Sequence, residues 1–330
     1  MLQEYSISPD LFSPEILNDK VSFLILREFL KGMVVNGLVA DLNKSQWQRS
    51  VFRNIDENQP AVRDQVLSIM KVLSDRNRII RHPKKTDEQP VNSSTWVNLA
   101  LDPDTLNCLN GILVDDRLYQ EFHGRSDLLL NLPEVLDSSA WDSMRRRTKT
   151  TTRNMDGFSD LLKPVLRYAR KTMLIDPYIS LKDRYKNTID LCAALQGNRE
   201  GERLVGRVQI HTDVKSQTSR ILTSDVSEEL VENLLDRWEE YLHPLSVRYG
   251  HQYEVYFWTD TKKSGKMHDR FILTDQCGLS FPYGLDIVPN NDALTTDVSL
   301  LDENVRALRW GDYSINTEKF NLVGMRSIVK

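Results

Sequence analysis

The second half of the chain alternates short apolar runs with amphipathic helical stripes, and this order limits its fold more than any other feature. Residues 188–195 and 224–242 carry apolar side chains at helical spacing, and Ser224 could cap the longer stripe. The predicted strands are residues 172–175, 207–211, 253–258 and 270–274. Strands that alternate with helices are typical of an α/β layer sandwich, so we expect that architecture here.

The first half predicts a separate mixed α/β domain. Residues 37–41, 78–81 and 111–116 are short apolar runs, and residues 62–73 form a helical stripe. A polar segment with cations and threonines then follows, and it includes Arg145, Arg146, Arg147, Lys149 and Arg153. We therefore place the domain boundary there, with domains at 1–150 and 151–330, and expect a mobile linker or a strip that contacts phosphates.

Composition narrows the classes of function. The formal net charge of −4 over 330 residues excludes a uniformly basic nucleic-acid coat, although a local basic patch remains open. No apolar stretch reaches the roughly 20 residues that a membrane span needs, and the first residues lack a basic signal region. Cys108, Cys192 and Cys277 are far apart, so we expect reduced, buried thiols in a cytoplasmic protein that does not contact membranes.

The stretch that begins at His268 is the most informative about chemistry. His268 and Arg270 are two residues apart at the start of a predicted strand, which would place both side chains on one face. A guanidinium binds phosphoryl oxygens in a fork, and an imidazole can attack phosphorus or transfer a proton. Asp275 follows at the far end of that strand, where it could hold the structure around the site or orient a neighbour.

This spacing resembles a known signature. His268-x-Arg270-x4-Asp275, followed by a Gly-x-x-Phe-x-x-Gly segment that ends at Gly284, resembles the H-x-K-x4-D motif of the phospholipase D superfamily. Residues 174–179 resemble the opening strand of that family. This strand often ends in Pro-Tyr, and the corresponding residues here are Pro177 and Tyr178. The resemblance implies a phospholipase D-like sandwich that cleaves phosphodiesters without a metal or a cofactor. His268, Arg270 and Asp275 would be its catalytic residues.

The chain departs from the family in two places. Arg270 replaces the family's lysine, and Leu285 and Asp286 stand where a serine and an asparagine usually follow. Asp286 is unfavourable beside a phosphate unless it pairs with Arg270 or a histidine. Only one signature is present, whereas a complete site in this family uses two histidines. The resemblance therefore implies a homodimer in which each chain supplies His268.

Each of these residues also has a structural interpretation. His268 could be a structural histidine at the start of a strand, with its hydrogen bonds satisfied by Asp269 or Asp275. Tyr178 either packs against neighbouring side chains or lines the pocket. His211, at the end of the preceding strand, is expected at the surface. Asp41, Asp115 and Asp116 lie at the ends of predicted strands and suggest a different chemistry. If the fold brings these carboxylates together, they could bind Mg²⁺.

Two functions remain open from the sequence. The first is a metal-independent nuclease, acting on DNA more readily than RNA, of a prokaryotic restriction or antiviral defence system. In it Tyr178, Gly284 and Asp286 would border the substrate, and the Arg145–Arg147 run would contact its backbone rather than read bases. The alternative is a non-catalytic module whose degenerate pocket binds nucleic acid or a partner protein.

Overall fold

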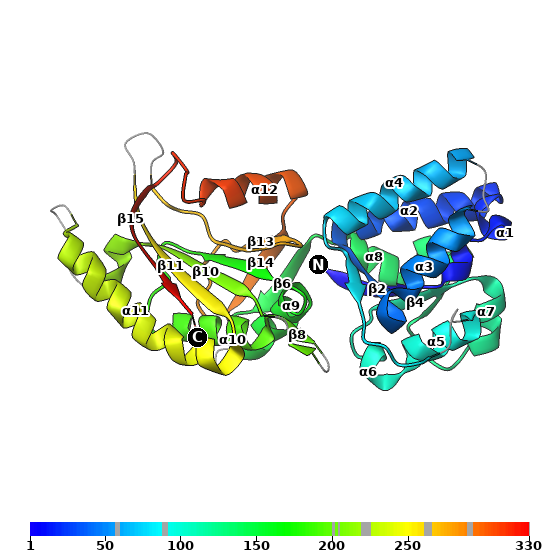
Figure 1. Cartoon of the computed structure of the whole chain (residues 1–330), viewed down its shortest axis with the longest axis horizontal. Coiled ribbons are helices and arrows are strands. Elements are labelled where there is room, and N and C mark those ends of the chain that lie inside the picture. The colour runs from blue at the N-terminus through cyan, green and yellow to red at the C-terminus, as the bar shows by residue number, and fades with distance from the viewer. Residues whose placement is uncertain are drawn as a thin grey trace. The chain divides into compact units, whose positions relative to one another are not determined.

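A computed structural model describes residues 1–56, 60–87, 92–199, 202–203, 205–218, 226–260, 266–288 and 293–329. The chain folds into two compact units, Met1–Arg147 and Thr148–Lys330. Each unit contains a β-sheet with helices packed against it (Figure 1), so the predicted α/β class is confirmed. The division falls a few residues before the expected boundary.

The first unit is built on five parallel strands in the order β3-β2-β1-β4-β5. Its strands are β1 (Gln3–Ile7), β2 (Gly37–Asp41), β3 (Ile79–Arg81), β4 (Gly111–Val114) and β5 (Leu129–Asn131). Every residue of β2 and β4 is buried, as expected for parallel strands covered on both faces. The connecting helices are η1 (Pro9–Phe12), α1 (Pro14–Leu17), α2 (Lys20–Asn36), α3 (Leu42–Asp56), α4 (Pro60–Asp75), α5 (Ser93–Leu101), α6 (Pro103–Leu106), α7 (Asp116–Phe122), η2 (Leu132–Asp137) and α8 (Ser139–Arg145).

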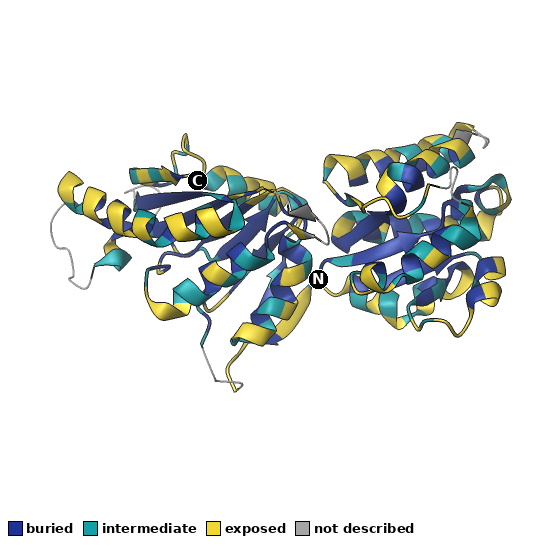
Figure 2. Cartoon of the chain, turned by 60° about the horizontal axis from the view of Figure 1, so that its bottom comes forward, coloured by how far each residue is buried: buried dark blue, intermediate teal, exposed yellow. Residues whose placement is uncertain are grey.

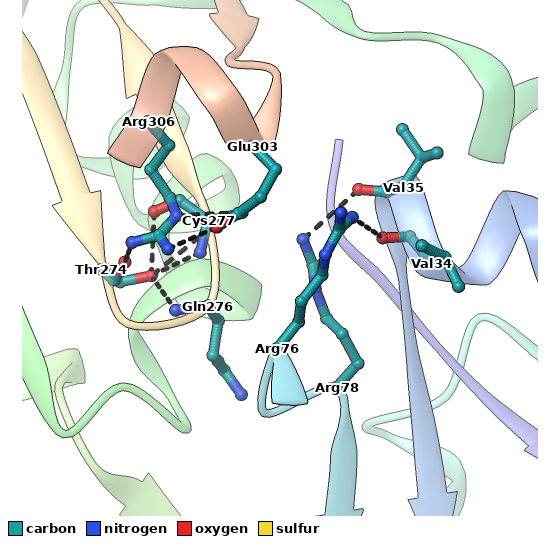
Figure 3. A network of polar contacts seen from close by, with 9 residues as sticks. All are labelled: Val34, Val35, Arg76, Arg78, Thr274, Gln276, Cys277, Glu303 and Arg306. Carbon is teal, nitrogen blue, oxygen red and sulfur yellow. Dashed lines mark hydrogen bonds and ion pairs between the residues drawn. The ribbon is translucent and has the colours of Figure 1, made fainter. Parts of the chain in front are cut away.

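The carboxyl end of α2 is held by two arginines that follow α4. Arg76 donates a hydrogen bond to the carbonyl of Val34 at 3.2 Å, and Arg78 donates to that of Val35 at 3.3 Å (Figure 3). These donors satisfy carbonyl groups that the last turn of a helix leaves open. They therefore fix the turn from α2 into β2.

The second unit contains an eight-stranded mixed sheet in the order β15-β11-β10-β7-β12-β13-β14-β6. Strands β7, β10 and β11 run parallel to one another, and the flanking strands pair antiparallel. The strands are β6 (Thr148–Thr152), β7 (Lys171–Ile175), β10 (Arg207–Asp213), β11 (Gln252–Thr259), β12 (Phe271–Thr274), β13 (Gly278–Ser280), β14 (Thr295–Leu300) and β15 (Asn321–Ile328). A separate hairpin joins β8 (Asn198–Arg199) and β9 (Glu202–Arg203). The strands predicted for this half are thus confirmed.

Helices cover both faces of this sheet. Figure 1 shows α12 (Glu303–Asp312) on one face and α10 (Asp183–Leu195) and α11 (Glu228–Tyr249) on the other. The remaining helices are α9 (Met155–Leu166) and η3 (Val214–Gln217). Figure 2 shows buried central strands and helices whose outer faces are exposed. Among the described helices, none is long and apolar enough to cross a membrane.

The predictions for the long helix and for the linker need correction. The long helix begins at Glu228 with Ser227 as its cap, and it continues to Tyr249; the proposed cap Ser224 lies outside the described residues. The polar run from Arg145 is not an irregular linker. It spans the end of α8 and the strand β6, which pairs with β14 through five residue pairs because threonines suit an exposed edge strand.

Candidate functional site

The residues of the candidate site meet at one edge of the second sheet. Ile175, the last residue of β7, pairs with His211 of β10 on one side and with Phe271 of β12 on the other. Because β12 runs antiparallel to β7, its first residue lies where β7 and β10 end. This register brings Asp176 and Arg270 to the same edge, and the carboxyl ends of parallel strands are where open α/β sheets bind ligands.

Asp176 anchors the loops around this edge. Its side chain is fully buried, and its carboxylate accepts hydrogen bonds from the backbone N–H groups of Tyr178 at 2.8 Å and Leu285 at 2.9 Å. Burial raises the pKa of Asp176, while these two hydrogen bonds and the charge of Arg270 lower it. Gly284 has a φ of +107°, and a Cβ on it would lie 3.3 Å from an Asp176 oxygen. Glycine thus permits the turn that directs the Leu285 amide to Asp176.

Arg270 is held between two loops. Its guanidinium carbon lies 5.5 Å from the centre of the Tyr178 ring, and it donates a hydrogen bond to the carbonyl of Pro282 at 3.3 Å. Tyr178 therefore contributes to the site rather than only to packing. The guanidinium is positioned at the sheet edge by a cation–π contact and by the backbone.

Asp286 forms an ion pair with Arg153, and both side chains are mostly buried. Arg153 also donates to the carbonyl of Tyr283 at 3.4 Å. The carboxylate that was expected to need Arg270 or a histidine is thus neutralised by another residue. In the sequence, Arg153 is one cation of the polar run, and no local signal distinguishes it there, because its pairing with Asp286 spans more than a hundred residues.

His268 lies in an irregular segment, so its expected position within a strand is wrong: β12 begins at Phe271. Its neighbours nevertheless alternate in direction. Met267 and Phe271 belong to the apolar cluster beneath α12, and Asp269 also faces that side. His268 itself is exposed, and no described residue forms a hydrogen bond or an ion pair with it. The proposed satisfaction of His268 by Asp269 or Asp275 is therefore not observed.

Asp269 fixes the segment that carries His268 and Arg270. Its carboxylate accepts a hydrogen bond from the Tyr313 hydroxyl at 3.3 Å, and Arg309 and Lys319 lie 3.6 Å away. Three residues from α12 and the segment after it thus converge on one carboxylate. The contact holds the segment to the α12 side and leaves the alternate residues free to face the opposite side.

His211 is completely buried, so the expectation of a surface histidine is wrong. Its Nδ1 accepts a hydrogen bond from the indole N–H of Trp258 at 3.1 Å, and its ring stacks on Tyr256 with centres 4.5 Å apart. Burial lowers the pKa of His211 to about 3. A neutral, enclosed imidazole of this kind supports the sheet and cannot contact a substrate.

Asp275 lies at the opposite end of β12 from His268. Its carboxylate accepts backbone N–H bonds from Arg170 at 3.1 Å and from Lys171, which begins β7. The adjacent hairpin is fixed as well (Figure 3): Arg306 donates to the carbonyl of Thr274 at 3.0 Å and pairs with Glu303. Asp275 thus joins the ends of β7 and β12, which is the structural role that the sequence left open for it; its assignment as a catalytic residue stays a prediction.

An open groove of about 810 Å³ adjoins this edge. Its lining residues are Tyr178, Lys182, Asp183, Arg184, Tyr185, Asp213, Lys215, Ser216 and Asp286. Burial, reinforced by the charges of Asp176 and Asp286, raises the pKa of Tyr185. Its hydroxyl therefore remains a hydrogen-bond donor at neutral pH. The groove residues other than Tyr178 and Asp286 gave no signal in the sequence, because they lie in loops and helix starts that meet only in the fold.

The acidic residues considered for Mg²⁺ do not form a ligand set. Asp41 is fully buried and accepts the backbone N–H of Trp47, Asp115 caps α7, and Asp116 accepts from Asn131. Strand β1 separates the strands that precede Asp41 and Asp115. Within the described ranges, no three carboxylate, histidine or cysteine side chains gather as metal ligands would.

The remaining candidate cations belong to the first unit. Arg145 lies over the Trp141 ring, and the carbonyl of Arg146 accepts a hydrogen bond from the amino terminus at 2.6 Å. Arg147 closes that unit, whereas the site around Arg270 is built from the second. Of the free cysteines, Cys192 and Cys277 are buried, and Cys108 is partly exposed rather than buried as expected.

Comparisons with known proteins identify no family. No family model and no curated protein matches the chain. Among solved structures, the chain is similar to TrmBL2, an archaeal chromatin protein whose structure shows a mode of DNA binding. The identity is 14%, the match covers 75% of this chain and 78% of that one, and the TM-score is 0.24. A likeness this weak supports no conclusion about fold or function.

Proposed function

We propose that the second unit is a metal-independent phosphodiesterase that cleaves nucleic acid, DNA more readily than RNA. The observation that carries this proposal is the position of Arg270 at the carboxyl edge of β7 and β10. Two residues before it lies an exposed His268, with which no residue of the described ranges forms a hydrogen bond or an ion pair. The alternation of residues 267–271 favours His268 on the Arg270 side of the sheet. A phosphoryl group held by the guanidinium would then lie within reach of the imidazole.

The reaction would proceed in two displacements. The imidazole nitrogen of His268 attacks phosphorus and forms a P–N bond, while the bond from phosphorus to the leaving oxygen breaks. Water then attacks the phosphohistidine and its oxygen bonds to phosphorus, while its proton passes to the group that protonated the leaving oxygen and the P–N bond to the imidazole breaks. Arg270 stabilises the charge that develops on the phosphoryl oxygens in both steps.

The leaving oxygen needs a proton from the side opposite to the nucleophile. One imidazole cannot occupy both positions, so we infer that two chains meet and that the second His268 donates this proton. The same resemblance to the phospholipase D superfamily suggests a prokaryotic restriction or antiviral defence system, with a partner protein as a further component.

A second candidate is a non-catalytic module that binds nucleic acid or a partner protein. Asp286 favours this alternative, because it is a carboxylate, paired here with Arg153, where the resembled family usually has an uncharged side chain. Both candidates share the groove and Arg270. They differ only in whether His268 acts on phosphorus.

Cleavage in the presence of EDTA separates the two. The full chain is incubated with plasmid DNA and with bis(p-nitrophenyl) phosphate, and His268→Ala is compared with His243→Ala, which removes an exposed histidine on α11. We expect His268→Ala to abolish cleavage and the control to retain it. Equal cleavage by both variants would refute catalysis by His268, and no cleavage by the wild-type chain would favour the binding module.

Mixed dimers test the shared site. Wild-type and His268→Ala chains carrying different affinity tags are refolded together, and the hybrid is isolated through both tags. A shared site predicts an inactive hybrid, because each reaction needs both imidazoles. About half of the wild-type activity in the hybrid, or full activity in a monomer, would contradict it.

A further inference from the structure

We propose that the groove beside Arg270 binds a single-stranded polynucleotide, whose bases stack on Tyr178 and Tyr283. This inference deepens the proposed function and rests on it in taking nucleic acid as the ligand. It adds the strandedness of the substrate and two residues that determine it.

Both tyrosine side chains are unusually open to solvent. Tyr178 is 51% exposed and Tyr283 is 67% exposed, whereas Tyr5, Tyr253 and Tyr313 are almost fully buried. Large exposed rings beside a groove cost hydrophobic stabilisation, and they are typical of surfaces that bind a ligand.

The backbones of both tyrosines are held rigidly. The Tyr178 amide donates to the buried carboxylate of Asp176, and the Tyr283 carbonyl accepts from Arg153. Gly284, with its left-handed backbone, fixes the turn directly after Tyr283. Rings presented by a fixed backbone lose little conformational entropy when a base stacks on them.

Both tyrosines belong to loops that contact Arg270. The guanidinium packs over the Tyr178 ring and donates to the carbonyl of Pro282, the residue before Tyr283. A phosphate bound by Arg270 would therefore lie close to the two loops that carry these exposed rings. Stacking of successive bases around a phosphate contact is how single strands are commonly held.

The charge of the groove points the same way. Lys182, Arg184 and Lys215 line it, and Asp183 and Asp213 offset two of them, because the third carboxylate, Asp286, is already paired with Arg153. A groove with so small a net charge gains little from the counterion release that supplies most duplex binding. Stacking must then supply a large part of the affinity, and the bases of a duplex are already stacked on one another. A duplex would have to unstack before its bases could reach the rings.

Fluorescence anisotropy tests the inference without depending on turnover. The full-length His268→Ala chain is titrated in EDTA with a labelled 12-nucleotide DNA strand, with the RNA strand of the same sequence and with the matched DNA duplex. Each titration is repeated with four further variants of this chain, in which Tyr178→Ala, Tyr283→Ala, Tyr283→Phe or Arg270→Ala is added singly. Phe52→Ala, which removes an exposed ring on α3 of the first unit, is the matched control.

We expect the single strands to bind at least tenfold more tightly than the duplex. Each tyrosine-to-alanine change should weaken single-strand binding by roughly 5- to 150-fold, the range that corresponds to about 1–3 kcal/mol per stacked base. Tyr283→Phe should retain binding, because the phenyl ring stacks equally well, and Phe52→Ala should have no effect. The DNA and RNA strands should bind within about threefold of each other, since rings and phosphate contacts do not read the sugar.

Binding that depends on Arg270 but favours the duplex would overturn the inference, and so would equal losses for Tyr283→Phe and Tyr283→Ala. Binding of the RNA strand much more tightly than the DNA strand would also contradict it. These outcomes are distinct from failure of the proposed function, which would appear as absence of cleavage by the wild-type chain while single-strand binding persists.

Discussion

Asp41 in the first unit should make the protein less stable as the pH rises. A carboxylate in a salt bridge would have the opposite effect. Its side chain is completely buried at the end of β2, and one oxygen accepts the backbone N–H of Trp47 at 3.0 Å. Burial raises the pKa of Asp41 to about 6 from an ordinary value of 3.8, although the neighbouring amides, Arg81 and His82 oppose this. The folded protein therefore keeps a proton that the unfolded chain releases.

The magnitude follows from proton linkage. As the pH rises from about 4 to about 6, Asp41 ionises in the unfolded state but keeps its proton in the folded state. This ionisation stabilises the unfolded state, so the free energy of unfolding falls. The difference between 3.8 and about 6, at about 1.4 kcal/mol for each pH unit, amounts to about 3 kcal/mol. The stabilisation is fully present below pH 4 and is lost as the pH passes 6.

Asp41→Asn removes this ionisation while keeping a carbonyl oxygen that can accept from Trp47. We expect the variant and the wild-type chain to have similar stability at pH 4, and the variant to be more stable at pH 7.5 by up to about 3 kcal/mol. Urea denaturation of the full chain, followed by tryptophan fluorescence and circular dichroism at both pH values, measures the difference. Asp75→Asn, at an exposed position on α4, is the control and should show no such dependence on pH.

A variant that is less stable than the wild-type chain at pH 7.5, or one whose effect is the same at both pH values, would refute this reasoning.

The other predictions concern the segments around His268. Asp269→Asn should lower kcat on DNA by about tenfold or more with little change in KM, because the carboxylate bonded to Tyr313 positions the segment that carries His268 and Arg270. The control Asp312→Asn removes a carboxylate that contacts the same Arg309 and Lys319 without touching that segment, and an equal loss in both variants would contradict the positioning role. Asp275→Ala should destabilise the protein by about 1–3 kcal/mol in urea denaturation, since Arg170 and Lys171 would lose their acceptor, and the folded fraction should retain cleavage. A variant of normal stability with no activity would instead return Asp275 to the chemistry.

The α/β class and the positions of the main strands could be predicted from the amino-acid sequence. Local patterns suffice for this, because apolar runs of four to eight residues and a helical stripe such as that of α11 reflect which faces must be buried. The spacing of His268 and Arg270 also pointed to the sheet edge where the candidate site lies. The predicted strand 270–274 agrees with β12 to within one residue, but His268, expected at its start, lies three residues before β12.

Tertiary structure alone decided which residues meet. Arg153 and Asp286 pair across a separation of 133 residues, and Asp275 reaches the start of β7 across more than a hundred. His211 became a core residue because β10 is a central strand flanked by β7 and β11, whereas its sequence neighbours are polar. Strand order in a mixed sheet is set by non-local pairing and by the burial it allows, and no local pattern encodes which strands become neighbours. The groove at the ends of β7 and β10, with Tyr178 and Lys215 from different loops, exists only because that order places those two strand ends side by side.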